Sequence, residues 1–464
     1  MTSDNAAPKP RMQKVIAHLA ALSIDELPGS VLSNARWCFL DSLGCGLFGS
    51  GKEWTRILAA EIDSDRAQGP CSIFGFSRRT AAPAAALCNG TGSHGFELDD
   101  LLDEAIVHPG AIVIPAALAA AEASGASGAD VILGVVAGYE VMNRVGLALG
   151  MEPAHRGFHK TSLAGPLGAA VAAGIVMKLD QKQLNSAVGL ACSAASGIKT
   201  FAVGEGGGMM KRMHAGRSAE AGVRMAQLAA RGFSGPPNAV ESRFGLLEVF
   251  GGAGANPEAL DHDLGKSWAV DNVYVKVYPC CSWIQASVQQ LVALRGASPL
   301  EPAQVQRIRI GTNSYARRLN GTVVPLDTMG AQYSIPYCAA LALTGDPADP
   351  AMYADAVISD PARRDLAHRV ELVPDEEMEA VYPRHYGSRV RVELMGGEVR
   401  ESTVLDPHGM PVDPCTEAER IEKFRRLASS VLAAAQVDRV IETVSALERE
   451  PSIETLSHLL APQR

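Results

Sequence analysis

Four short clusters in the chain combine residue types that can transfer protons or hold an anion. The first runs from Glu97 through Asp99 and Asp100 to His108 and lies between two apolar stretches. Acidic residues are rare in such surroundings unless they are paired or functional, and a loop with carboxylates between rigid helices is a common plan for an active site. The structural alternative is that the two aspartates cap the next segment and His108 hydrogen-bonds a backbone carbonyl. For this cluster taken alone, that alternative is favoured.

The second cluster, around His159, Thr161 and Ser162, opens a helix of small residues. The first turn of a helix has unpaired N–H groups that can bind a carboxylate. An imidazole titrates near neutral pH, so His159 is a candidate general acid or base. The alternative is an ordinary helix cap beside a surface histidine, and the residues favour neither interpretation.

The third cluster is glycine-rich and cationic. Glycines from Gly206 onward precede Lys211, His214 and Arg217. Arginine can bind a carboxylate through two parallel hydrogen bonds and lysine acts as a point charge, so Lys211 and Arg217 are candidates for holding carboxylates. The alternative is a surface loop with solvated charges. The neighbouring methionines weaken that alternative.

The fourth cluster contains Lys276, which alternates with valines in residues 273–278 and precedes Pro279 and two cysteines. The alternation predicts a strand that directs Lys276 to the junction of two domains. Taken alone, a solvated lysine on the polar face of that strand is the favoured interpretation.

No cofactor and no metal are predicted. The pattern G-x-G-x-x-G occurs at 44–49 and 90–95, but neither copy follows a predicted strand, so neither is read as a dinucleotide site. The chain contains no paired Cys-x-x-Cys set and no H-E-x-x-H helix.

Composition narrows the class of protein. The 464 residues are 47% apolar and 20% charged, with a net charge of −9, which favours a large packed core and argues against a nucleic-acid partner. Nine scattered cysteines favour reduced thiols and a cytoplasmic location. The N-terminus lacks the pattern of a signal peptide. No apolar run is expected to span a membrane, since the best candidate, 111–121, is too short.

Periodicity and composition predict a mainly α fold. The expected domains are a helical first part over 11–267, an α+β domain over 268–404 and a helical return over 405–464. The predicted helices are two within 11–50, then 81–89, 110–124, 130–149, 161–177, 183–196, 214–231, 283–295 and further helix within 416–460. Strands are predicted at 273–278 and 305–311, with a hairpin over 389–400.

These clusters, in this order, resemble the MmgE/PrpD family, which includes 2-methylcitrate dehydratase, cis-aconitate decarboxylase and iminodisuccinate epimerase. The likeness covers nearly the whole chain and rests on the motifs Leu40-Asp-Ser-Leu-Gly, Asn89-Gly-Thr, His94-Gly-Phe-Glu-Leu-Asp-Asp, His108-Pro-Gly, Gly157-Phe-His-Lys-Thr-Ser, Lys211 with His214-Ala-Gly-Arg-Ser-Ala, Gly232-Phe-Ser-Gly-Pro, Lys276-Val-Tyr-Pro-Cys-Cys and Gln332-Tyr-Ser-Ile-Pro-Tyr. The resemblance implies a large all-α domain built from both chain ends, a smaller α+β lid domain, a homodimer, and a site between the domains.

The resemblance also implies roles for individual residues. The catalytic set is His108, His159, Lys211 and Lys276, with Asp99 in the acidic loop. Asp100 belongs to the same loop. The complete set predicted to bind substrate is Glu97, Asp100, Thr161, Ser162, Arg217 and Tyr315. In this set Thr161, Ser162 and Arg217 come from the residue chemistry described above, and Tyr315 is a candidate for the site tyrosine of the decarboxylase branch. The chain departs from the family pattern at Glu97 and Leu101, where the decarboxylase branch carries Asp and Thr, and at Gln285, where many members carry His.

The expected activity is that of a cofactor-free lyase or isomerase, 2-methylcitrate dehydratase-like, that abstracts a proton next to a carboxylate of a small polycarboxylic acid. His159 is expected to be the base and His108 the acid. Loss of hydroxide, return of the proton on the opposite face, and loss of carbon dioxide would give a dehydratase, an epimerase and a decarboxylase respectively, and all three remain open. A non-catalytic polycarboxylate-binding protein is the alternative from another class.

Overall fold

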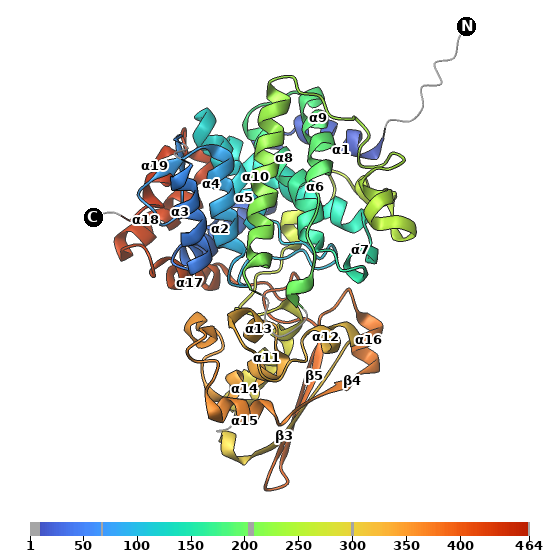
Figure 1. The fold of residues 1–464 in the computed structure, drawn as a ribbon, viewed down its shortest axis with the longest axis vertical. Helices are drawn as coiled ribbons and strands as arrows, with labels where there is room; N and C mark the ends of the chain where they lie inside the picture. The colour runs from blue at the N-terminus through green and yellow to red at the C-terminus, as the bar shows by residue number, and fades with distance from the viewer. Residues whose placement is uncertain (1–9, 66–67, 203–207, 298–300, 463–464) are drawn as a thin grey trace.

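The computed structural model describes residues 10–65, 68–202, 208–297 and 301–462, and it contains a large helical part and a smaller α+β part. In Figure 1 the helical part lies above and combines the blue-to-green first half of the chain with red C-terminal helices, while the orange α+β part lies below. Helix accounts for 59% of the structure and strand for 8%. The predicted mainly α fold is therefore confirmed.

The helical part owes its dense packing to small residues where helices cross. A Cβ added to Gly138 of α6 (Gly128–Ala148) would lie 3.0 Å from the carbonyl oxygen of Gly168 in α8 (Lys160–Val176), so only glycine permits this approach. The elements of this part are α1 (Arg11–Ala20), α2 (Gly29–Ser50), α3 (Glu53–Ser64), β1 (Cys71–Ser72), β2 (Arg79–Thr80), α4 (Ala82–His94), α5 (Gly110–Ser124), α6 (Gly128–Ala148), α7 (Glu152–His155), α8 (Lys160–Val176), α9 (Gln181–Ala191) and α10 (Met210–Ala230).

The C-terminal helices return to the first ones, as the red and blue ribbons of Figure 1 show. They are α17 (Glu417–Ala428), α18 (Ala434–Ser445) and α19 (Glu454–Leu459). On α17 the Lys423 ammonium lies 2.7 Å from the Asp41 carboxylate of α2, and both side chains are buried. Gly44 of α2 leaves room for the Phe424 ring, since an added Cβ would lie 3.1 Å from it.

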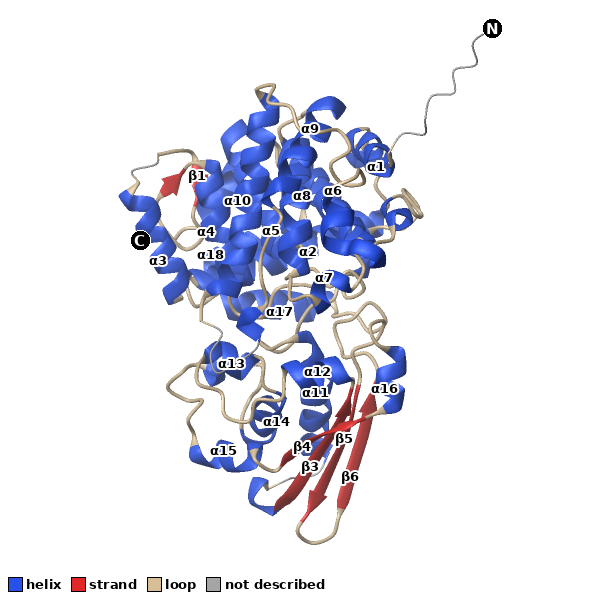
Figure 2. Ribbon diagram, turned by 45° about the vertical axis from the view of Figure 1, so that its right-hand side comes forward, coloured by secondary structure: helices blue, strands red, loops and turns tan. Residues whose placement is uncertain are grey.

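The α+β part is built around a four-stranded sheet (Figure 2). Its order is β4-β3-β5-β6, with β3 and β4 parallel and the other pairs antiparallel. The elements are α11 (Ser282–Ala297), β3 (Val305–Thr312), α12 (Ser314–Leu319), α13 (Thr328–Gln332), α14 (Ile335–Thr344), α15 (Pro361–Ala367), β4 (Val370–Pro374), α16 (Glu376–Val381), β5 (Ser388–Leu394) and β6 (Val399–Val404). The predicted hairpin corresponds to β5 and β6, and helix α11 was also predicted.

The strand predicted for residues 273–278 is wrong. This segment is extended but forms only an isolated antiparallel bridge, in which Tyr274 and Leu101 exchange backbone hydrogen bonds of 2.8 and 3.0 Å. Val275 also donates to the carbonyl of Gly409 at 3.0 Å. The alternating valines therefore belong to an extended segment that connects the two parts of the molecule. Strand β4 was not predicted from the sequence.

Among the described residues, one helix, α6, passes a test of length and composition for crossing a membrane, and most of it is buried inside the molecule. The apolar run named from the sequence, 111–121, lies within the shorter α5, and the apolar run of α6 is interrupted by Glu140 and Arg144. The structure pairs these two side chains with each other at 2.8 Å.

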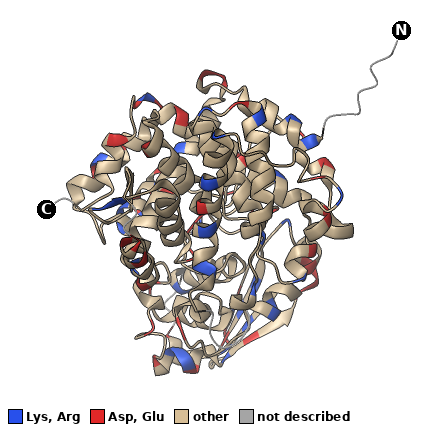
Figure 3. Cartoon of the chain, turned by 45° about the horizontal axis from the view of Figure 1, so that its top comes forward, with Lys and Arg blue, Asp and Glu red and all other residues tan. Residues whose placement is uncertain are grey.

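Basic and acidic residues are interspersed around the molecule, as Figure 3 shows. Some charged side chains are instead buried. A charge removed from water must be compensated by a partner. Several such charges lie together where the helical part meets the α+β part.

Candidate active site

The loop between α4 and α5 supplies the acidic residues of the site. Glu97, Asp99 and Asp100 are 1–2% exposed. A bridge between Leu102 and Val107 folds the loop back on itself. Glu97 has φ of 58°, a left-handed conformation that is strained for a residue with a Cβ. The loop is thus held in one conformation that keeps its carboxylates inside.

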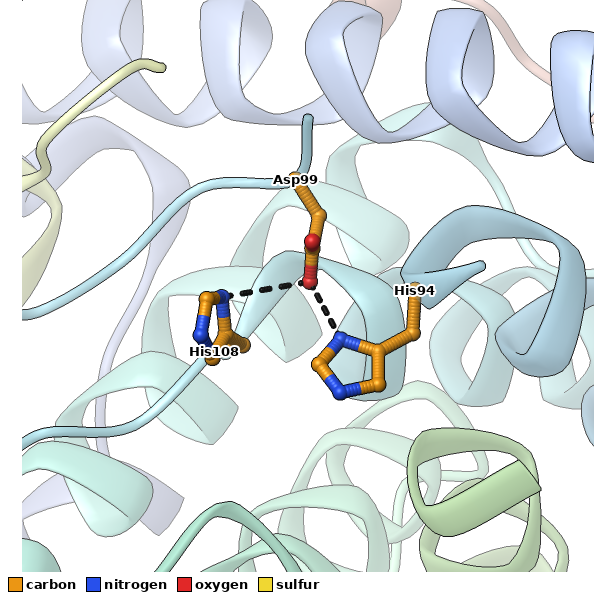
Figure 4. Close-up of side chains that lie close together, drawn as sticks. All are labelled: His94, Asp99 and His108. Atoms are coloured by element: carbon orange, nitrogen blue, oxygen red, sulfur yellow. Dashed lines mark hydrogen bonds and ion pairs between the residues drawn. The ribbon is translucent and has the colours of Figure 1, made fainter. Parts of the chain in front are cut away.

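Asp99 lies between two histidines (Figure 4). Its Oδ2 is 2.6 Å from Nδ1 of His94 and 3.3 Å from Nδ1 of His108. Burial alone would raise the pKa of Asp99, but the two imidazoles outweigh it and hold the pKa well below its usual range. Asp99 is therefore ionised at neutral pH.

The environment of His108 fixes its tautomer. Its Nδ1 also lies 2.8 Å from the carbonyl oxygen of Asp100, so both neighbours of Nδ1 are acceptors. Nδ1 must carry a hydrogen, which leaves Nε2 to exchange protons with a substrate. Burial lowers the pKa of His108 to about 4, although Asp99 opposes that shift. The resting imidazole is neutral, and Asp99 is placed to stabilise its protonated form.

The trio of His94, Asp99 and His108 has metal-ligating atoms within 4.8 Å of one another. However, the 2.6 Å between His94 Nδ1 and Asp99 Oδ2 is a hydrogen-bond distance. Two atoms bound to one tetrahedral zinc at usual bond lengths would lie roughly 3.4 Å apart. The geometry fits a hydrogen-bonded network better than a metal site. The absence of a metal remains a prediction.

His159 pairs with a further histidine. It is the residue before α8, and its Nδ1 lies 3.0 Å from Nδ1 of His214 on α10. Burial lowers the pKa of His159 well below the usual value, and the neighbouring His214, His94 and Lys211 lower it further. The His94 ring lies 5.7 Å from the His159 ring, and so connects this pair to Asp99. A neutral His159 can donate through Nδ1 to His214 and keep its Nε2 lone pair free.

Glu97 forms ion pairs with both predicted lysines. Lys211 contacts Oε1, and Lys276 lies 3.2 Å from Oε2. Burial would raise the pKa of Glu97, but the two ammonium groups lower it to about 2. Lys276 has a raised pKa because Glu97 and Asp99 outweigh the opposing effect of burial. Lys276 is thus charged, and the two lysines share one buried counterion.

Gln285, singled out in the sequence as a departure from the pattern of the resembling family, does not enter this cluster. Its side-chain amide donates to the carbonyls of Tyr278 at 2.7 Å and Cys280 at 3.1 Å. These bonds hold the turn that follows Lys276. Gln285 therefore stabilises the backbone that follows Lys276.

Three predicted substrate-binding residues contact the protein rather than an open space. Thr161 accepts a hydrogen bond from the backbone N–H of His108 at 3.2 Å, and the Ser162 hydroxyl lies 3.5 Å from Nδ1 of His159. Asp100 accepts from the Tyr139 hydroxyl at 2.5 Å and from the N–H of Gly110 at 2.8 Å. These contacts fasten the histidines and the loop.

Two predicted residues lie outside the buried cluster. Arg217 is 61% exposed and pairs with Glu220. Tyr315, on α12, lines a cavity between the two parts, where its hydroxyl accepts a hydrogen bond from Lys199. The site brings together His108, His159, Lys211, Lys276, Asp99 and Glu97, and leaves these two apart.

The residues singled out from the sequence did not include His94, His214 or Lys199 as site residues. One signal was present: His214 lies three residues after Lys211, which places both on one face of α10. The glycine-rich segment before α10 gave no help, since its residues 206–207 lie outside the described residues. Nothing in the sequence distinguished His94 from a helix-terminal histidine.

Buried histidines backed by a carboxylate, beside paired lysines, define an enzyme site for acid–base chemistry on an anion. Comparison with known proteins agrees. The MmgE/PrpD N-terminal domain matches residues 13–258 and the MmgE/PrpD C-terminal domain matches residues 278–449. The chain belongs to the MmgE/PrpD family, whose members include lyases, and it is an enzyme of that type.

Curated relatives align along nearly their full length. The cis-aconitate decarboxylase-like protein oryM of Aspergillus oryzae is 30% identical over 99% of both chains. The cis-aconitate decarboxylase of Aspergillus terreus is 28% identical over 96% of this chain and 95% of its own. The mitochondrial 2-methylcitrate dehydratase of Yarrowia lipolytica is 24% identical over 95% of this chain and 88% of its own.

Proposed function

We propose that this enzyme moves a proton at the carbon next to a carboxylate of a small polycarboxylic acid, with dehydration of a 2-methylcitrate-like substrate as the leading reaction. The observation that carries the proposal is the convergence of two neutral imidazoles and two charged lysines in one buried cluster. The relatives named for action on aconitate and methylcitrate support the same substrate class.

The two histidines are suited to different steps. His159 faces another imidazole, and burial holds its pKa well below the usual value, with His214, His94 and Lys211 adding to the shift, so it is unprotonated and ready to accept a proton. His108 has Asp99 behind it, which stabilises the imidazolium and suits it to donate. We therefore assign His159 as base and His108 as acid. Each such group typically contributes about 10²–10⁴-fold to the rate.

The lysines stabilise the charge that develops after proton removal. Loss of a proton beside a carboxylate gives an enolate-like dianion, which needs fixed positive charge close by. Lys211 and Lys276 supply that charge, and their ion pairs with Glu97 hold both ammonium groups in place. One preorganised donor of this kind contributes about 3 kcal/mol.

Decarboxylation of a cis-aconitate-like acid is the second candidate. The relatives with 30% and 28% identity carry that activity in their names, whereas the dehydratase is 24% identical. The same residues would serve, because loss of carbon dioxide also leaves a carbanion that His108 can protonate. Glu97 and Leu101 differ from the pattern that the resemblance implies for the decarboxylase branch, and these differences argue against strict decarboxylation and against strict 2-methylcitrate dehydration alike.

One experiment separates these reactions. Purified protein is incubated in deuterated water with 2-methylcitrate, cis-aconitate or iminodisuccinate, and proton and carbon NMR follow the products. New olefinic signals from methylcitrate support dehydration, loss of a carboxyl carbon identifies decarboxylation, and deuterium uptake without net loss identifies an epimerase. Binding of all three acids without turnover or exchange would refute the proposal and favour a non-catalytic binding protein.

A cytoplasmic location and a homodimeric state are also proposed. The scattered cysteines are free thiols in the structure, and seven of them are fully or nearly fully buried, which accords with a reducing compartment. Light scattering during size-exclusion chromatography tests the dimer, and fractionation of the native cells tests the location.

A further inference from the structure

A large cavity opens between the helical part and the α+β part, beside the buried cluster. Its volume is about 1070 Å³, and its walls include Arg156 and Lys199 from the helical part and Tyr315, Arg318 and Tyr382 from the α+β part. Phe201 connects the two places: its ring lies 5.4 Å from the His159 ring, and it immediately follows the wall residues Lys199 and Thr200. The cavity is thus next to the reacting groups.

The backbone places Lys199 with the same elements that place His159. Phe158 and Ile198 form an antiparallel bridge, flanked by hydrogen bonds from His159 to Gly197 at 3.0 Å and from Lys199 to Gly157 at 2.8 Å. The backbone hydrogen bonds therefore hold His159 and Lys199 at fixed positions on neighbouring extended segments. The Lys199 side chain is partly buried and is held by the Tyr315 hydroxyl.

The cations of this cavity have no acidic partners among the described residues. Lys199 bonds only to the Tyr315 hydroxyl. Arg318 lies over the Tyr315 ring at 5.3 Å. Arg156 donates to backbone carbonyls at 3.3 Å. The acidic wall residue, Glu379, is already bonded to the backbone N–H and the hydroxyl of Ser314.

The central cluster, by contrast, is already balanced. Lys211 and Lys276 carry two positive charges, and Glu97 and Asp99 carry two negative ones. A substrate with two or three carboxylates would bring more negative charge than this cluster can neutralise. Additional cations are needed close by, and the cavity supplies them.

The Lys199–Tyr315 contact has a direction. A lysine ammonium only donates hydrogen bonds, so the Tyr315 oxygen must be the acceptor. The phenolic hydrogen is then free to donate to a ligand, and burial raises the pKa of Tyr315 to about 12, so the hydrogen stays in place. Ammonium and phenol together make a paired donor for one carboxylate.

Building on the proposed function, we propose that Lys199, with Tyr315 and Arg318, binds the substrate carboxylate farthest from the reacting carbon, and that the cavity is the route by which the anion enters. Lys199 is then a binding residue that determines specificity for acids with a remote carboxylate. The proton-transfer groups act at the other end of the same substrate.

The test compares two acids that differ only in that carboxylate. Citraconate is cis-aconitate with a methyl group in place of the carboxymethyl group. Titration calorimetry measures both acids with the native protein, Lys199→Gln and Lys199→Arg. Loss of a charge-assisted hydrogen bond weakens binding by roughly 10–100-fold. We expect that loss for cis-aconitate with Lys199→Gln, about a threefold change or less for citraconate, and partial recovery with Lys199→Arg.

The matched control is Arg384→Gln, which removes one positive charge from the wall of a second cavity at the same junction. It should leave both affinities unchanged, and thermal melting of each variant checks folding. Equal weakening of both acids by Lys199→Gln, or no weakening of either, overturns the inference.

Steady-state kinetics then separate this inference from the proposed function. With a substrate that the native enzyme turns over, Lys199→Gln should raise KM with little change in kcat; a fall in kcat at constant KM would contradict the binding role. If the native protein turns over none of the acids, the proposed function fails. The calorimetry still decides whether Lys199 binds the remote carboxylate.

Discussion

The buried cluster and the neighbouring cavity differ in whether their charged side chains have partners within the protein. In the cluster, Glu97 and Asp99 neutralise the two lysines, and every one of these side chains is 1% exposed. In the cavity, Lys199 and Arg318 form no ion pair with any described residue. Charges that must be held rigidly for chemistry are paired within the protein, whereas charges that attract a ligand are left for the ligand to neutralise.

A third region sharpens the contrast. The second cavity at the junction, about 620 Å³, is lined by Asp103, Glu104 and Asp406 among other acids. Burial and the nearby Asp406 raise the pKa of Asp103 well above its usual value. Arg144 and Arg384 also line this cavity, so it carries charges of both signs with acidic residues in the majority. The first cavity has one acidic residue among its described wall residues, Glu379, and is mainly cationic.

The largest effect should come from the proton-transfer pair. Replacing His108 by Asn removes the proposed acid, and kcat should fall by about 10²–10⁴-fold while KM changes little. Asp99→Asn should lower kcat in the same direction because the imidazolium loses its carboxylate. Rapid-quench or NMR assays measure both. A kcat within about threefold of the native value would assign the chemistry elsewhere.

Removing the shared counterion should damage stability. Glu97→Gln leaves two buried ammonium groups without their carboxylate, and the free energy of unfolding should fall by about 3–5 kcal/mol in urea titrations. The double variant Glu97→Gln with Lys276→Met should recover part of this loss, since one unpaired cation is gone. Additive losses in the double variant would mean that the pair does not hold the cluster together.

Binding of an anionic substrate in the cavity should depend on pH, because the charge of Lys199 does. Burial lowers the pKa of Lys199 to about 8, with Lys211 and Arg318 adding to the shift and Cys281 opposing it. Lys199 is protonated below that pH and loses its charge above it. KM for a tricarboxylate should therefore rise above about pH 8, by up to about tenfold per pH unit.

Lys199→Arg is the control for this profile, because guanidinium stays charged over the whole range. The variant should flatten the rise in KM. Lys160 also lies near Lys199 and has its pKa lowered to about 7 by burial and then by Lys199, so a residual slope near pH 7 is assigned to it. An unchanged profile in Lys199→Arg would remove Lys199 from the explanation.

The smallest expected effect is that of salt. Raising the ionic strength from about 0.01 M to about 0.15 M shortens the screening length from roughly 30 Å to roughly 8 Å. The attraction of an anion into the cationic cavity should weaken, and kcat/KM should fall by about two- to fivefold with kcat unchanged. Lys199→Gln should show a weaker dependence on salt. A salt effect on kcat instead would place the screened charges in the buried cluster.

Much of the helical framework was predictable from sequence because its signals are local. The helix over 110–124 was predicted with the bounds that α5 has, and the hairpin of β5 and β6 followed from an alternating pattern around two glycines. For residues 273–278 the same local pattern predicted a strand that the structure does not contain. Alternating valines describe an extended backbone, but only a neighbouring strand turns such a segment into a sheet, and none is present beside the described residues of this segment.

The site, like the fold, has features that local sequence predicts and features that only packing decides. Residue types and order along the chain predicted a catalytic role for the two histidines, the two lysines and Asp99, and the structure places them in one buried cluster. Their catalytic roles stay predictions. The counterion role of Glu97, the histidine pairs at His94 and His214, and the isolation of Arg217 were decided by tertiary structure. Residue chemistry and helical periodicity are properties of neighbours in sequence. Which charges meet depends on contacts such as those of Glu97 with Lys211 and Lys276, which are 114 and 179 residues away in sequence, and only packing brings such segments together.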